Sequence, residues 1–227
     1  MSPAPGRPAG NNATGEETRA QLIAAATEVF IDEGYKSARV ADIATRAQVR
    51  LSAINYHFGG KEGLYLAVLG HHAQLAIERT PIVSPQPGLS SRARLHFFVT
   101  ALLTRLLGDG TGEGEAIRLP ALMSREIMSP TAALDTMFER FIKPQSAQLD
   151  ALVRDIAGAD LTQDQVRRAM LSVFGQCMTY RLARPMVERL DPSLYGRGDL
   201  VAHLADHISA FSWAGLQAMR EGRESQA

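Results

Sequence analysis

Hydrophobic residues recur at helical spacing along almost the whole of this sequence, and no segment shows the alternation that is typical of β-strands. In the first such pattern Leu22, Ala26, Val29 and Phe30 share one helix face, and Gly34 marks its end. Further patterns cover residues 40–47, 51–57, 61–79, 92–107, 115–128, 131–157, 162–189 and 199–220. The sequence therefore predicts an all-α protein.

A proline-rich segment separates these patterns into two groups. Pro81, Pro85 and Pro87 stand within TPIVSPQPGLSS, and proline cannot continue a helix. We expect a linker at 81–91 between an N-terminal domain at 16–80 and a C-terminal helical domain at 92–221. Residues 1–15 lack the apolar region of a signal peptide and are expected to form a disordered tail. The capping-box pattern at 14–17 places the start of the first helix there.

The composition excludes several classes of protein. Of the 227 residues, 45% are hydrophobic and 21% are charged, as in ordinary soluble globular proteins. No apolar run approaches the roughly 20 residues of a membrane span. Cys177 is the single cysteine, so an internal disulfide is excluded and the cytoplasm is the expected location.

The distribution of charge indicates a nucleic-acid site. The chain has 24 basic and 24 acidic residues, but residues 36–61 carry five basic residues against Asp42 alone. These are Lys36, Arg39, Arg46, Arg50 and Lys61. Such an excess suits contact with phosphates, although a solvated helix face has the same appearance.

Residues 40–58 have the pattern of a helix-turn-helix. Ile43 and Ala44 form the apolar face of a first short helix, and Ile54 and Phe58 form the inner face of a second. The outer face of the second helix carries Arg50, Leu51, Ser52, Asn55 and Tyr56. In the major groove arginine pairs with guanine and asparagine with adenine. A purely structural αα-hairpin fits the same pattern.

The stretch 16–70 resembles the DNA-binding domain of TetR-type transcriptional regulators. The resemblance rests on the segment beginning at Val40, on INYHF at 54–58, and on the Lys61-Glu62 pair. It implies a three-helix helix-turn-helix domain whose recognition helix spans 50–58. It further implies phosphate contacts for Tyr56, His57 and Lys61, and base contacts among Arg50, Leu51, Ser52 and Asn55.

Three residues depart from the family pattern. Arg39 replaces the usual threonine, so it cannot cap the helix, although it could bind a phosphate while Ser37 supplies the cap. Gln48 replaces the turn glycine, which strains the turn if a positive φ is required there. Arg50 replaces a small capping residue.

The C-terminal half resembles one branch of the same family, the CerR type, through FGQCMTYRLARP (174–185) and RPMVERL (184–190). The resemblance implies a helical bundle that binds a small molecule and dimerises through its last two helices. A homodimer is also expected because one recognition helix reads too few base pairs, whereas two can read a palindromic operator.

Adaptable aromatic and methionine side chains are the candidates for the ligand site. They are Phe97, Met123, Phe138, Phe174, Met178 and Tyr180, with Gln176 as a polar contact. An ordinary helical core would use the same residues. Arg118 and Arg125 would favour an acidic ligand, and ordinary surface charges are the alternative for both. We expect a repressor that a small molecule releases from DNA, with the helix at 61–79 transmitting the change and no cofactor involved.

Three other interpretations remain. An enzyme has little support, because Cys177 lacks a partner and GGKEG (59–63) is not a phosphate-binding loop. A metal or redox sensor could use His203 and His207, four residues apart, or Cys177. A helical interaction module that binds no DNA is the third.

Overall fold

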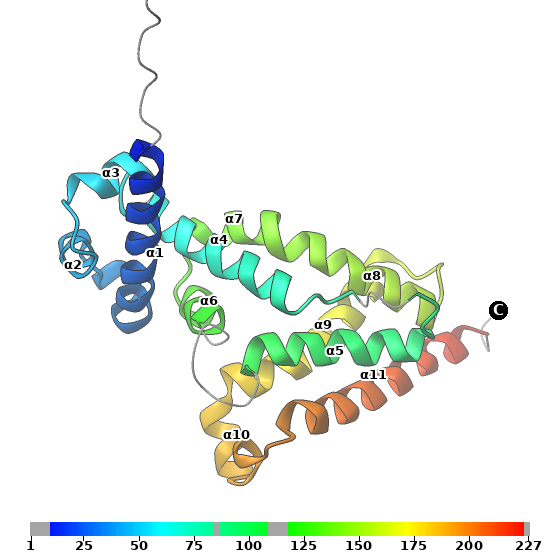
Figure 1. Cartoon of the computed structure of the whole chain (residues 1–227). Coiled ribbons are helices and arrows are strands. Elements are labelled where there is room, and N and C mark those ends of the chain that lie inside the picture. Colours follow the sequence, from blue (N-terminus) through cyan, green and yellow to red (C-terminus); the bar gives the residue numbers. More distant parts are fainter. Residues whose placement is uncertain (1–9, 84–86, 109–117, 225–227) are drawn as a thin grey trace, which may run out of the picture.

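The computed structural model describes residues 10–83, 87–108 and 118–224, and every regular element in these ranges is helical (Figure 1), which confirms the all-α prediction. The N-terminal helices are α1 (Gly10–Ser37), α2 (Val40–Arg46), α3 (Ser52–Phe58) and α4 (Lys61–Arg79). The next elements are α5 (Ser91–Leu107), α6 (Arg118–Met128), α7 (Ala133–Met137), the π-helix η2 (Phe138–Ile142) and α8 (Lys143–Ala157). The last are α9 (Gln163–Leu182), α10 (Arg184–Leu190), the short 3₁₀ helix η3 (Leu194–Gly196) and α11 (Leu200–Glu224).

Helices α1 to α4 enclose one hydrophobic core. Leu22, Phe30, Ile43, Ile54 and Leu64 lie at its centre with at most 1% of their surface exposed. Their spacing is that of the predicted apolar faces, so burial of those faces accounts for the arrangement.

The start of α1 differs from the prediction. The helix begins at Gly10, so residues 10–15, expected in the tail, are helical and Thr14 lies inside the helix instead of capping it. Residues 1–9 lie outside the described ranges. At the other end, Gly34 interrupts the regular helix with a φ of 77°, a conformation that glycine adopts without strain.

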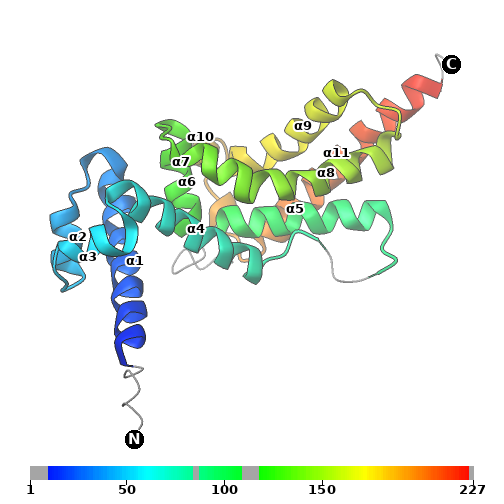
Figure 2. The same cartoon turned by 90° about the horizontal axis from the view of Figure 1, so that it is seen from above.

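Helices α5, α8, α9 and α11 form a second body with its own core (Figure 2). Leu95 and Leu103 of α5, Val153 of α8, Val173 of α9 and Ile208 of α11 are all buried there. Helix α4 leads from the first body toward the second, and its chain continues past Ile82, which is part of the second core (Figures 1 and 2).

Helices α6 and α7 follow the proline-rich segment in the sequence but pack against the N-terminal helices. Leu122, Ala133 and Met137 belong to the core of α1–α4. The boundary that the prolines indicate in the sequence is therefore crossed by tertiary contacts.

Two long predicted helices are divided by prolines. The pattern at 131–157 contains α7, η2 and α8, because Pro144 has no N–H to donate to a preceding carbonyl, and the chain widens to a π-turn in which the Lys143 N–H bonds to Phe138 O. The pattern at 162–189 is divided at Ala183 into α9 and α10, with Pro185 in the first turn of α10.

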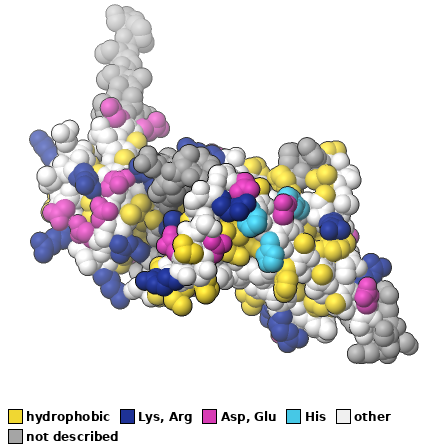
Figure 3. All heavy atoms as spheres, turned by 90° about the horizontal axis from the view of Figure 1, so that it is seen from below, with side chains coloured by type: hydrophobic (Ala, Val, Ile, Leu, Met, Phe, Trp, Pro, Cys, Tyr) yellow, Lys and Arg dark blue, Asp and Glu magenta, His cyan; other side chains and the backbone are white. Residues whose placement is uncertain are grey.

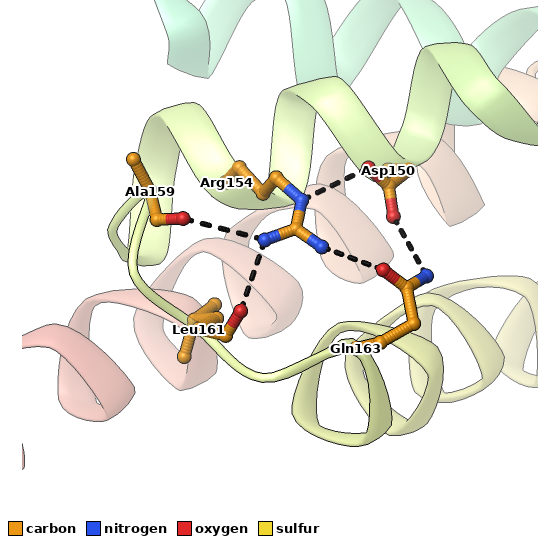
Figure 4. Close-up of polar contacts among 5 residues, drawn as sticks. All are labelled: Asp150, Arg154, Ala159, Leu161 and Gln163. Atoms are coloured by element: carbon orange, nitrogen blue, oxygen red, sulfur yellow. Dashed lines mark hydrogen bonds and ion pairs between the residues drawn. The ribbon is translucent and has the colours of Figure 1, made fainter.

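The corner between α8 and α9 is held by one arginine. The Arg154 guanidinium donates to Asp150 Oδ1 (3.0 Å), to the carbonyls of Ala159 (3.3 Å) and Leu161 (3.0 Å), and to Gln163 Oε1 (2.8 Å) (Figure 4). Two of these bonds satisfy carbonyls of the loop between α8 and α9, which lie outside both helices. None of the described helices is both long and apolar enough to span a membrane.

Candidate nucleic-acid interface

The turn between α2 and α3 has the geometry of a Schellman motif. The Val49 N–H bonds to Ala44 O (3.0 Å) and the Gln48 N–H to Thr45 O (3.1 Å). This closure requires a left-handed residue, and Gln48 adopts it with a φ of 56°. Among the described residues Gln48 is the single non-glycine residue with positive φ, so the strain anticipated from the missing glycine is present.

A group of glycines sets the position of α3 on α4. Gly59 ends α3 in the left-handed conformation, with a φ of 72°, and its N–H bonds to Asn55 O (2.9 Å). A Cβ atom on Gly63 would lie 1.9 Å from Phe58 O, far inside van der Waals contact. The GGKEG segment is therefore a close crossing of two helices.

Most of the predicted DNA-contacting residues share one exposed edge. Arg50, Leu51, Ser52, Asn55 and Tyr56 are exposed, with Tyr56 at 84%, while Ile54 on the opposite side of α3 is buried in the core. Helix α3 itself covers Ser52–Phe58, so Arg50 and Leu51 lie in the turn that leads into it. This exposed edge is therefore accessible to a groove of DNA.

The N-terminus of α2 differs from one detail of the prediction. Arg39 is the N-cap residue and no side chain caps the helix, so Ser37 does not supply the cap. Ser37 instead ends the preceding helix α1, two residues before the cap position. The Arg39 side chain is exposed beside the first turn of α2, where it could meet a phosphate.

His57 and Lys61 are only partly exposed. Lys61 Nζ donates to Lys36 O at 3.2 Å and stands 4.9 Å from the centre of the Tyr35 ring. Lys61 therefore also fastens the end of α1 to the start of α4, while two of its three ammonium hydrogens are left for other acceptors. The ring of His57 packs edge-on against Tyr56, with centroids 4.9 Å apart.

Contacts of α6 with α1 and α4 were not predicted from the sequence. Tyr65 Oη of α4 donates to Glu126 Oε2 at 2.8 Å, and the N–H and hydroxyl of Thr131 donate to Glu126 Oε1 at 2.6 and 2.9 Å. Glu126 is 1% exposed, so these three hydrogen bonds take the place of water around its buried carboxyl group. Burial, followed by the bond to Glu126, raises the pKa of Tyr65. No local pattern pairs residues 61 positions apart.

Two arginines proposed for an acidic ligand are engaged with α1 instead. Arg118 forms an ion pair with Glu28 at 2.6 Å, and Arg125 donates to Asp32 O at 2.8 Å. Both guanidiniums therefore join α6 to α1, in line with the Tyr65–Glu126 contact to α4.

The seven candidate ligand residues are distributed over both cores and the surface. Phe97 and Tyr180 pack against the C-terminal core, whereas Met123 packs against the N-terminal core. Phe138 and Phe174 are 46% and 38% exposed. The Gln176 amide bonds to Ser172 O and Ser212 Oγ, and Met178 is partly exposed. Residue type and spacing on single helices do not reveal which helix faces meet.

The residues of the sensor interpretation are separated as well. Cys177 is fully buried, and burial raises its thiol pKa to about 12, so the reactive thiolate is suppressed. His203 and His207 are exposed on α11, and Asp206 between them bonds to His96 of α5 at 2.9 Å. Histidines lie among apolar and acidic side chains on the face in Figure 3. Within the described ranges no three metal-ligating side chains gather.

Comparison with known proteins gives two family matches. The model for bacterial regulatory proteins of the tetR family matches residues 22–68, and the model for the C-terminal domain of the HTH-type transcriptional dual regulator CecR matches residues 91–216. The chain is 30% identical to CecR of Shigella flexneri over 184 residues, which cover 76% of this chain and 79% of that protein.

Other relatives and solved structures are similar over much of the chain. The HTH-type transcriptional activator FasR of Mycolicibacterium smegmatis is 32% identical over 143 residues, 59% of this chain and 65% of that protein. The crystal structure of the regulator FadR from Bacillus subtilis in complex with stearoyl-CoA superposes with a TM-score of 0.63 at 22% identity, over 86% of this chain and 98% of that chain.

Proposed function

Since the chain belongs to the TetR family of bacterial transcriptional regulators and carries a C-terminal domain of the CecR type, we propose that it binds a palindromic operator as a homodimer under the control of a small molecule. The resemblance of residues 174–190 to this branch is confirmed, under the name CecR and not CerR. Proteins of this family bind DNA and are not enzymes, which excludes the catalytic interpretation.

The exposed edge of α3 carries the proposal for DNA binding. With Ile54 anchored in the core, Arg50, Leu51, Ser52 and Asn55 face solvent and are assigned to base edges. Tyr56, His57, Lys61 and Arg39 are assigned to phosphates, which position the protein without reading sequence.

A salt titration separates these roles. Arg39→Gln should weaken binding to all DNA alike and lower the slope of log K against log salt by about one, whereas Asn55→Ala should also change base preference. Arg167→Gln, which removes an exposed charge from α9, is the matched control and should leave binding unchanged. Gel-shift titration on the chain's own promoter and on scrambled DNA measures both effects. Equal losses for Arg39→Gln and Asn55→Ala on every sequence would contradict the assignment.

Exposed apolar side chains on α9–α11 support the proposal of a dimer through the last helices. Leu171 and Phe211 are 66% and 65% exposed, and Met186 and Leu190 of α10 are 64% and 85% exposed. Large apolar residues so exposed favour association. Phe211→Glu should give a monomer in analytical ultracentrifugation and abolish operator binding, while Met128→Glu on α6, at an even more exposed position, should leave the dimer intact. A dimeric Phe211→Glu protein would exclude this interface.

The relatives regulate in different directions, since FasR is named an activator, NicS of Pseudomonas putida a repressor and CecR a dual regulator. We assign repression to this chain, in the cytoplasm, with the bound small molecule releasing the operator. The structure of FadR was solved in complex with stearoyl-CoA, which supports the proposal that a small molecule controls this chain. A promoter–reporter fusion should be more active when the gene is deleted, and lower activity on deletion would establish activation.

A further inference from the structure

Among the half-buried arginines that the structure describes in the C-terminal half, two lack an acidic partner, whereas Arg118 and Arg154 each have one. Several arginines of the described residues form an ion pair with a carboxylate. The pairs are Arg94–Asp155, Arg118–Glu28, Arg154–Asp150, Arg168–Asp164, Arg184–Glu188 and Arg197–Asp199. Arg105 of α5 and Arg181 of α9 are half-buried, and within the described residues they bond to neutral oxygen atoms only.

The Arg105 guanidinium is the more enclosed of the two. Its Nε donates to Thr80 O at 2.7 Å and one terminal nitrogen donates to Gln145 Oε1, while the other terminal nitrogen is buried without a hydrogen-bond partner. Burial lowers the pKa of Arg105 to about 10, and no neighbouring acid counteracts this. Thr80 is the C-cap residue of α4, so Arg105 receives only the partial negative charge of a helix end.

Arg181 is in a comparable position. Its Nε lies 3.4 Å from Ser124 Oγ of α6, which is the one hydrogen bond it makes within the described residues. Burial, and then the like charge of Arg184, lower its pKa. A charge withdrawn from water without a counter-charge is costly, and the fork of a guanidinium matches a carboxylate or phosphate.

We propose that the effector of this regulator carries a carboxylate or phosphate group, and that Arg105 and Arg181 bind it. The inference rests on the proposed control by a small molecule and specifies the chemical class of that molecule. The aliphatic and aromatic side chains around α5 and α9, among them Phe97 and Tyr180, would accommodate an apolar body attached to the anionic head.

The placement of the two arginines connects such a ligand with DNA binding. Helices α5 and α9 belong to the C-terminal core, but Arg105 reaches the end of α4 and Arg181 reaches α6. Both α4 and α6 contribute to the core of the DNA-binding domain (Figure 1). An anion that takes these guanidiniums from Thr80 and Ser124 weakens contacts that hold α4 and α6 in their present positions.

The test compares ligands that share one chain and differ in the head group. Decanoate and decyl phosphate should each raise the thermal midpoint of the wild-type protein more than decanol does, and the stronger of the two identifies the head. In Arg105→Gln and Arg181→Gln the half-maximal concentration of the preferred anion should rise roughly tenfold or more. The exposed Arg167→Gln control should respond as the wild type does.

The outcomes separate this inference from the proposed function. If neither anion exceeds decanol in the wild type, or if both glutamine variants keep the full preference for the anion, the inference is wrong. Arg105→Lys keeps the charge without the fork and should have intermediate affinity, which also controls for misfolding. If the anions bind through the arginines but do not change operator affinity, ligand control of DNA binding fails while the anion site stands.

Discussion

At the scale of single residues, the helix-turn-helix depends on backbone conformations at two positions. The turn after α2 needs a left-handed residue, which here is Gln48, and the crossing of α3 over α4 needs a residue without a Cβ, which is Gly63. Both requirements arise from the path of the backbone and do not depend on a side-chain interaction. They therefore give predictions that can be checked by single substitutions.

Gln48→Gly should stabilise the protein. It removes the steric penalty of a left-handed non-glycine residue. The greater entropy of glycine in the unfolded chain offsets part of this, so we expect a net gain of roughly 0.5–1 kcal/mol in the free energy of unfolding. Urea denaturation measures the change. Gln48→Ala keeps the penalty and should give no gain, so equal stability of the two variants would show that the turn is unstrained.

Gly63→Ala should be strongly destabilising. Its Cβ would lie 1.9 Å from Phe58 O and 3.0 Å from Phe58 C, so α3 must shift away from α4. We expect a loss of about 3 kcal/mol and of operator affinity, by denaturation and gel shift. Gly175→Ala in α9, where no atom lies within 4 Å of the new Cβ, is the control and should gain up to about 1 kcal/mol. A Gly63→Ala protein as stable as wild type would refute the close crossing.

At the scale of elements, α6 is the helix that joins the two bodies. It follows α5 in the sequence, yet Leu122 is in the N-terminal core and Arg118, Arg125 and Glu126 all bond to α1 or α4. Movement of α6 would therefore act directly on the helices that support α3.

A double-mutant cycle on Tyr65 and Glu126 measures this junction. Tyr65→Phe keeps the ring against Phe30 and Tyr35 but removes the hydroxyl bond to Glu126, and should cost about 1–2 kcal/mol. Since both residues act through one bond, the loss in Tyr65→Phe with Glu126→Gln should fall short of the sum by about 1 kcal/mol. Strict additivity in urea denaturation would mean that the bond does not form in solution.

At the scale of the whole molecule, burial of Cys177 makes the free energy of unfolding depend on pH in the alkaline range. The folded thiol has its pKa raised from 9.0 to about 12, so the unfolded chain releases this proton at lower pH than the folded one. The contribution of the protonated thiol to the free energy of unfolding is fully present below pH 9. It is lost as the pH rises toward 12, by at most about 1.4 kcal/mol per pH unit.

Denaturation between pH 8 and 10 tests this prediction. Cys177→Ala should be less stable at pH 8 because of the cavity, but its stability should fall less steeply from pH 9 to 10 than that of the wild type. Parallel curves for the two proteins would show that the thiol ionises normally in the folded state. They would also reopen the redox interpretation, which requires an accessible thiolate.

The sequence by itself determined what depends on local spacing. The apolar faces around Ile43 and Ile54, the left-handed turn at Gln48 and the exposed edge from Arg50 to Tyr56 all follow from residues a few positions apart, because a helix fixes which of its side chains share a face. The motif at 54–61 indicated the family on the same local basis. Pro144 and Pro185 disturb the helices in which they stand for a local reason, the missing N–H, but the π-turn before Pro144 is seen only in the backbone.

Only the tertiary structure decided which faces meet. It placed α6 against α1 and α4 and distributed the candidate ligand residues over two cores and the surface. Arg118 and Arg125 bond to α1, whereas Arg105 and Arg181 have no acidic partner among the described residues. The bond between Tyr65 and Glu126 joins residues 61 positions apart, and whether an arginine has an acidic partner depends on helices from across the chain. Local spacing cannot supply this information, because burial and charge pairing are set by packing between elements.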